Sequence, residues 1–144
     1  MLKRLPMRRR PRHTGPVAAT VALVLQRDGY CCRWCGFGVS GERGRDYSLH
    51  HRLPRRMGGT SRPDINSPAN LVTVHGNGTQ GCHQEIESHR AEAQAHGWLL
   101  YAGDNPADRP ILVDREGAWK YFNNDGGESD LPPGENVTGW GRAQ

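Results

Sequence analysis

Large apolar side chains are scarce in this chain. Only 35% of its 144 residues are hydrophobic, and it contains two Phe and three Met against 19 Gly and 10 Pro. A single domain with so little apolar material buries a modest core, and a structural metal ion can supply the missing folding free energy. The four Cys and seven His are the candidate ligands for such an ion.

The chain also lacks a long hydrophobic run. Its longest apolar stretch, residues 17–25, has nine residues, which is too few to span a bilayer. The basic residues before it resemble the start of a secretory signal, but Gln26-Arg27-Asp28-Gly29 is not a small-residue cleavage site. We therefore expect no membrane partner and a reducing cytoplasm, where paired Cys bind metal more often than they form disulfides.

Positive charge is unevenly distributed along the chain. Residues 1–12 carry six Lys and Arg and no acid, and residues 42–62 carry six Arg against two acids. From Asp104 onward, eight acids outweigh four bases. Positive charge near the histidines favours a phosphate backbone as partner, although a basic arm is also typical of solubilising tails and targeting segments.

The pattern divides the chain into three parts. We expect a disordered basic arm over residues 1–15, a folded domain over residues 16–122 and a flexible acidic tail over residues 123–144. Within the domain the sequence predicts two helices, over 17–28 and 82–96, and strands over 47–49, 71–74, 98–101, 111–113 and 118–122. This order indicates a small α+β fold.

The middle of the chain contains an ordered series of histidines and glycines. The series runs through Leu49-His50-His51-Arg52, Pro54 and Gly58-Gly59 to Asn70-Leu71-Val72, and ends with Cys82-His83. It resembles the motif of the HNH endonuclease superfamily over about 35 residues, and residues 25–122 resemble more loosely the small HNH proteins of tailed bacteriophages. The resemblance implies a ββα-metal (His-Me finger) unit at about residues 46–97, one catalytic divalent cation (Mg, Mn, Ni or Zn) and cleavage of DNA. It also implies the DNA-packaging terminase as a partner, in the cytoplasm of a bacterial host.

The paired histidines should have different roles, because neighbouring residues of a strand point to opposite faces. By resemblance, His50 and His83 bind the cation, and His51 is the general base that activates water. Asn70 corresponds to the asparagine that braces the loop carrying the base and helps to orient its imidazole. Imidazole suits a general base because its free pKa lies near neutrality, and a divalent cation suits a scissile phosphate.

A third ligand for this cation is expected from the predicted helix. Glu87 follows His83 by four residues and shares its face, whereas His89 is turned about 120° away. Glu87 is therefore preferred over His89, with a water molecule as the alternative.

Three arginines follow the paired histidines. Arg52 is expected at the transition-state phosphate, and Arg55 and Arg56 are expected on the DNA backbone, because the guanidinium fork matches phosphate. The alternative for each of them is a solvated loop.

The cysteines indicate a second metal site, a structural zinc. Cys32 and Cys35 form a C-x-x-C pair, and His75 with Cys82 could supply the other two corners of a tetrahedron. Cys31 competes with Cys32, but the two-residue spacing favours Cys32. The HNH variants with a zinc knuckle, which these cysteines fit, are expected to carry Cys at the position of His75. Free buried thiols are the alternative.

Two other functions stay open at this point. A noncatalytic nucleic-acid-binding module held by zinc would use the same arginines for backbone contacts. A structural subunit of phage assembly would carry the motif as a vestige, although the complete set of His50, His51, Asn70 and His83 argues against it. The absence of a separate base-reading domain predicts low sequence specificity.

Overall fold

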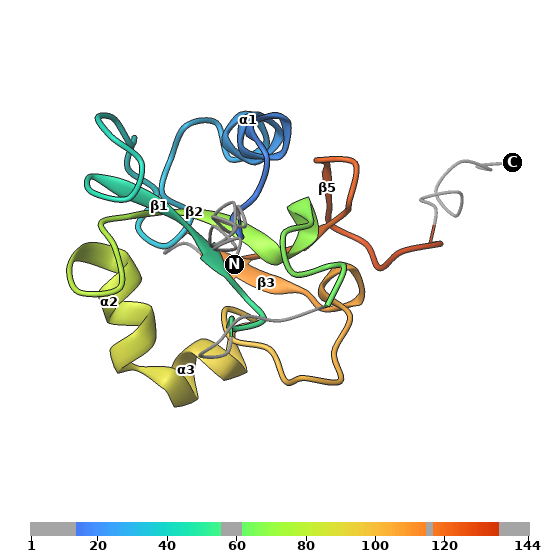
Figure 1. Ribbon diagram of the computed structural model, residues 1–144. Helices are drawn as coiled ribbons and strands as arrows, with labels where there is room; N and C mark the ends of the chain where they lie inside the picture. Colours follow the sequence, from blue (N-terminus) through green and yellow to red (C-terminus); the bar gives the residue numbers. More distant parts are fainter. Residues whose placement is uncertain (1–13, 56–61, 115–116, 136–144) are drawn as a thin grey trace, which may run out of the picture.

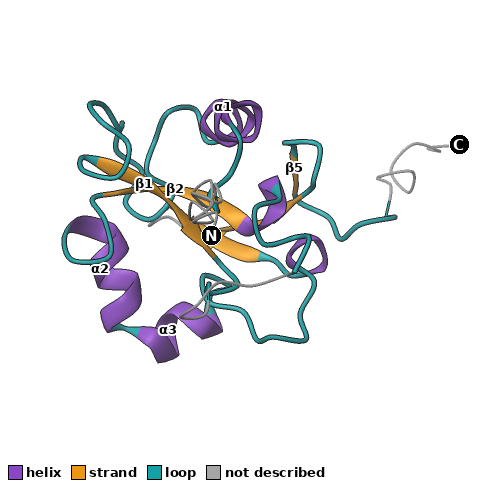
Figure 2. Ribbon diagram, in the orientation of Figure 1, coloured by secondary structure: helices purple, strands orange, loops and turns teal. Residues whose placement is uncertain are grey.

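The computed structural model describes residues 14–55, 62–114 and 117–135 (Figure 1). These residues form a small mixed α+β fold with two antiparallel sheets. The strands lie in the middle of the molecule and helices lie on either side of them (Figure 2). None of the helices in these ranges has the length and apolarity needed to cross a membrane. The predicted basic arm up to residue 13, Arg56, Gly58-Gly59 and residues 136–144 lie outside the described residues.

The first sheet pairs β1 (Tyr47–His51) with β2 (Leu71–His75), so each predicted strand is longer by one or two residues. The antiparallel register sets His50 opposite Val72 and His51 opposite Leu71. Side chains of directly opposite residues share a face, and successive side chains alternate. The two histidines therefore point to opposite faces of the sheet, as the sequence predicts.

Helices cover both faces of this sheet (Figure 1). On one face α1 (Ala18–Arg27) packs Val24 against Leu49 and Leu71. The opposite face of β2 joins α2 (Gly81–Ser88) in the main core, which includes Val72, Val74 and Ile86. The face that carries His50 is therefore the one covered by α2.

The helix predicted over residues 82–96 is two helices, α2 and α3 (Arg90–Ala95). The break lies at His89, whose φ of −115° and ψ of 56° are not helical. Its main-chain N–H and its ring Nδ1 both bond to Glu85 O, at 3.0 and 2.9 Å. The change of direction lets α3 bury Ala93 in the main core, so tertiary packing overrides the local helix propensity.

The strand predicted over Trp98–Tyr101 is wrong, because this segment is irregular. Trp98, Leu99 and Leu100 are all buried, so the alternation of a half-exposed strand is absent. Gly97, just before them, has a φ of +77°, and a Cβ there would lie 2.0 Å from Pro110 O. Only glycine fits this close approach at the end of α3.

The second sheet lies at the C-terminal side. β3 (Ile111–Val113) and β4 (Ala118–Phe122) pair as an antiparallel hairpin over the predicted ranges. A short strand that the sequence does not predict, β5 (Glu128–Ser129), pairs with β4 inside the stretch expected to be a flexible tail. Glu128 also bonds to Arg33 at 3.0 Å, which ties this strand to the cysteine-rich turn.

Candidate metal centres

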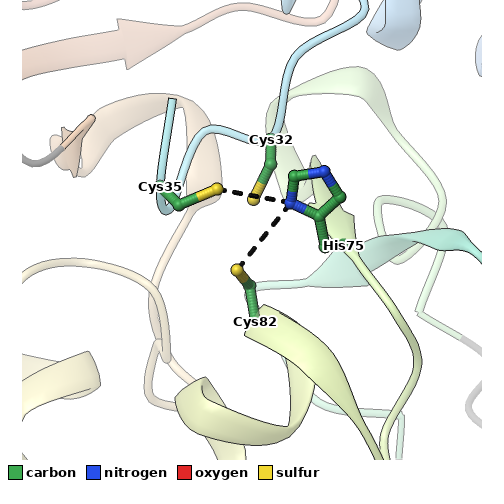
Figure 3. A group of neighbouring side chains, drawn as sticks. All are labelled: Cys32, Cys35, His75 and Cys82. Carbon is green, nitrogen blue, oxygen red and sulfur yellow. Dashed lines mark hydrogen bonds between the residues drawn. The ribbon is translucent and has the colours of Figure 1, made fainter. Parts of the chain in front are cut away.

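The first candidate centre is a cluster of three thiols and one imidazole, contributed by Cys32, Cys35, His75 and Cys82 (Figure 3). Their ligand atoms all lie within 4.8 Å of one another. His75 Nδ1 is 3.3 Å from Cys35 Sγ and 3.9 Å from Cys82 Sγ. Ligands at about 2.1–2.3 Å from a tetrahedral zinc are about 3.5–3.8 Å apart, so the cluster has the dimensions of a structural zinc site.

The protonation of His75 suits metal binding. Its Nε2 lies 2.9 Å from Gly38 O, and a carbonyl oxygen only accepts, so Nε2 carries the ring proton. The lone pair is then on Nδ1, the atom that faces Cys35 and Cys82 (Figure 3). A second contact of this kind commonly fixes the tautomer of a metal-bound histidine.

Two local structures bring the four ligands together. The turn after α1 places Cys32 beside β2, where Arg33 N donates to Thr73 O at 2.9 Å. The loop from His75 to Cys82 closes tightly, since a Cβ at Gly76 would lie 2.1 Å from Gln80 O. The cluster contains Cys32 as predicted, whereas Cys31 Sγ is 3.3 Å from Gly29 O.

Burial makes these thiols poor acids when they are alone. It raises the pKa of Cys32 and of Cys82, and the neighbouring cysteines raise the pKa of Cys82 further. A bound divalent cation reverses this effect, because it stabilises the thiolates. The cluster therefore has the donor set of a metal site rather than that of a redox pair.

The second candidate centre brings together His50 of β1 with His83 and Glu87 of α2. One ligand atom from each lies within 4.8 Å of the other two, and the imidazole rings meet edge to face with centroids 5.2 Å apart. These are the three residues that the sequence predicts as ligands of one divalent cation. His89 is not part of this group, because its ring bonds back to Glu85 O.

His50 has an unsatisfied nitrogen in the protein interior. Its Nε2 is 2.7 Å from Trp98 O and therefore donates, which leaves the lone pair on Nδ1. This Nδ1 is buried and has no hydrogen-bond partner among the described residues. A buried acceptor without a partner costs free energy, and a cation held with His83 and Glu87 would satisfy it.

His83 and Glu87 are each held by a hydrogen bond from another side chain. Ser48 Oγ lies 2.8 Å from His83 Nδ1, so His83 Nε2 is the nitrogen left for a ligand role. Arg90 donates to Glu87 Oε2 at 3.0 Å. Burial lowers the pKa of His83, and that of His50 to about 3, so both rings are neutral at neutral pH as metal ligands must be.

His51 lies on the other face of β1 and is half-buried. Burial lowers its pKa, so the ring is neutral at neutral pH, with one nitrogen as donor and the other as acceptor. Its Nε2 lies 2.9 Å from Asn66 Oδ1. The sequence does not single out Asn66, since this residue stands in a polar loop where no spacing distinguishes it from its neighbours.

Asn70 is fully buried and joins the two loops beside His51. Its Oδ1 accepts from Leu53 N at 2.7 Å and its Nδ2 donates to Ile65 O at 2.8 Å. It thus has the geometry of the predicted brace for the loop after the base. The ring of His51 bonds to Asn66 rather than to Asn70.

The role predicted for Arg52 at a phosphate is wrong. Arg52 is fully buried, and its guanidinium donates to five main-chain carbonyls, those of Ala69, Gly97, Pro106, Arg109 and Pro110. Burial lowers its pKa to about 9, so it stays cationic at neutral pH. All of its hydrogen-bonding capacity serves the fold, and no donor remains for DNA.

Arg55 is exposed, and its Nη2 donates to Thr14 O. It is the one predicted DNA-binding arginine within the described residues. Arg56, the other, lies outside them.

Comparison with protein-family models, with curated proteins and with solved structures finds no match for this chain. The Cys₃His cluster suits a closed structural metal. The His₂Glu cluster has fewer protein ligands, as in metal sites that bind a substrate or water.

Proposed function

We propose that this protein is a metal-dependent DNA endonuclease of the HNH type. The observation that carries the proposal is the buried Nδ1 of His50, which has no hydrogen-bond partner in the described part of the chain and shares a possible cation site with His83 and Glu87. The order β1, β2 and α2 around that site supports a ββα-metal unit. The adjacent His51 supplies a neutral imidazole on the same strand.

The proposed reaction is hydrolysis of a phosphodiester bond. His50, His83 and Glu87 would hold the divalent cation, which supplies a Lewis acid for the phosphate and the leaving oxygen when bound. His51 takes the proton of the attacking water as general base. The water oxygen bonds to phosphorus and the bond from phosphorus to the 3′ oxygen breaks, leaving a 5′-phosphate and, after protonation, a 3′-hydroxyl.

The substrate is proposed to be DNA because positive charge gathers around this part of the sequence. Residues 42–62 carry six Arg, and Arg55 is exposed just after the paired histidines. Arg52 does not contribute, since its guanidinium is enclosed by main-chain carbonyls. The Cys₃His cluster would hold a structural zinc that links the turn after α1 to the start of α2.

A supercoiled-plasmid assay tests the proposal. Purified protein is incubated with plasmid and Mg²⁺, Mn²⁺, Ni²⁺ or Zn²⁺, and nicked and linear products are measured. His51→Ala and His83→Ala should abolish cleavage, whereas His96→Ala is the matched control, because His96 lies outside both clusters.

Cleavage that survives a chelator and both substitutions would contradict the mechanism. DNA binding without cleavage by any of the four cations would instead favour a noncatalytic, zinc-held nucleic-acid-binding module.

A further inference from the structure

The side chain of Asn66 connects the ring of His51 to the main chain near the N-terminus. Asn66 Oδ1 is 2.9 Å from His51 Nε2, and Asn66 Nδ2 donates to Thr14 O at 3.1 Å. Thr14 is the first described residue after the Arg-rich segment of the sequence. Three segments distant in sequence therefore meet at the proposed general base.

The polarity of this connection follows from Thr14. A carbonyl oxygen only accepts, so the NH₂ group of Asn66 must face Thr14 and its oxygen must face His51. That oxygen also only accepts, so the ring nitrogen opposite it, Nε2, must carry a proton. In a neutral imidazole the lone pair is then on Nδ1.

Both ends of the connection are held by other contacts. Arg55 Nη2 donates to the same Thr14 oxygen at 2.5 Å. Asn66 lies in a turn in which the N–H and the hydroxyl of Ser67 bond to Asp64 O at 3.1 and 2.7 Å. The orientation of the amide is therefore preset before any substrate binds.

We propose that Asn66 is a positioning residue that holds His51 as its Nε2–H tautomer, so that Nδ1 is the atom that accepts the proton of water. The role in catalysis rests on the proposed nuclease function, whereas the tautomer does not. The two asparagines then have different roles. Asn70 joins the loops at Leu53 and Ile65, and Asn66 orients the ring of His51.

The tautomer is measured by long-range ¹H–¹⁵N correlation spectra of the imidazoles in the zinc-loaded full chain at neutral pH. The His51 signal is identified by its loss in His51→Gln. Wild type and Asn66→Asp should both show a protonated Nε2, because a carboxylate also only accepts. Asn66→Ala should show an average of the two tautomers, and Asn123→Ala, which removes an asparagine of the β4–β5 turn, should match wild type.

Cleavage kinetics test the consequence. A positioned general base contributes about 10²- to 10⁴-fold to a rate, and Asn66→Ala should lose part of this, so we expect kcat to fall by about 10- to 100-fold without a change in KM. Asn66→Asp should keep most of the rate, although it loses the bond to Thr14. Thermal unfolding shows whether each variant folds. If Asn66→Ala does not fold, the tautomer and the kcat of Asn66→Asp test the inference.

A His51 protonated on Nδ1 in the wild type would overturn the inference, as would an unchanged spectrum or an unchanged kcat in Asn66→Ala. If the wild type cleaves no DNA, the nuclease proposal fails. The spectra still decide whether Asn66 sets the tautomer.

Discussion

Arg52 is a cation in the protein interior, and no carboxylate of the described residues lies at bonding distance from it. Its guanidinium is instead surrounded by five carbonyl oxygens from three segments. One is Ala69 just before β2, one is Gly97 after α3, and the third is the stretch 106–110 before β3. Removing the side chain would take a donor from all five oxygens, of which Pro106 O alone is also bonded to a main-chain N–H in its own turn, and a buried carbonyl left without a donor costs about 1–3 kcal/mol. A residue that resembles a phosphate ligand in the sequence is thus a structural centre of the fold.

Arg52→Ala should therefore destabilise the protein by about 3–5 kcal/mol, as the loss of a buried charged partner does. Chemical denaturation measures this change. Arg55→Ala is the matched control, because Arg55 is exposed and should change stability by less than about 0.5 kcal/mol while lowering DNA affinity. An Arg52→Ala variant as stable as wild type would contradict the structural role.

The adjacent His50 and His51 differ in what surrounds them. His50 bonds to Trp98 O and keeps a buried Nδ1 beside His83, whereas His51 bonds to Asn66. The difference follows from the strand, which sends the two side chains to opposite faces.

The affinity for the cation should distinguish the proposed ligand His83 from the proposed base His51. His83→Ala removes one of three ligands and should weaken binding of a Mn²⁺ or Co²⁺ ion by at least about 100-fold, beyond the loss of a group that only supports a ligand. His51→Ala should bind the ion as wild type does. Calorimetric titration of zinc-loaded protein measures both, and equal affinities in all three proteins would refute the assignment of this centre.

The segment between α3 and β3 positions the second centre through its main chain. Gly97 O accepts from Arg52 and the next carbonyl, Trp98 O, accepts from His50. These two successive carbonyls are bonded to buried side chains and not to a neighbouring strand, and the segment is irregular.

Gly97→Ala should disturb this segment strongly. The positive φ and a Cβ only 2.0 Å from Pro110 O force the main chain to move, and we expect a loss of about 2–3 kcal/mol in stability. Gly103→Ala is the control, because a Cβ there meets nothing within 4 Å. The difference between their thermal unfolding midpoints measures the effect, and equal midpoints would show that the close approach is not needed.

At the scale of the whole molecule, the two candidate centres share one helix. Cys82 of the Cys₃His cluster and His83 of the second centre are neighbours at the start of α2. The first cluster also joins the turn after α1 to that helix. A metal in the first centre would therefore stabilise the position of ligands in the second.

Loss of the first metal should affect the whole domain. Cys35→Ser should lower the zinc content below one per chain and lower Tm by about 10 °C, which corresponds to about 2 kcal/mol. It should also weaken cation binding at His83. Cys31→Ser is the matched control, because Cys31 lies outside the cluster, and it should keep both zinc and Tm. Unchanged Tm in Cys35→Ser would exclude a structural role for this cluster.

The sequence by itself determined the arrangements that depend on neighbours along the chain. Strand alternation separates His50 from His51, helix spacing places Glu87 beside His83, and the C-x-x-C spacing selects Cys32 over Cys31. These patterns need only the local geometry of one strand, one helix or one turn.

Only the tertiary structure decided which groups meet across long stretches of chain. Three such contacts join residues 15 to 58 positions apart: the enclosure of Arg52, the bond that His50 donates to Trp98 O, and the link between Thr14 and His51 through Asn66. The break at His89 and the irregular segment from Trp98 have the same origin. Burial of Ala93 and Trp98 in the main core overrides local propensity there, because burying these apolar side chains contributes more free energy than a local preference provides.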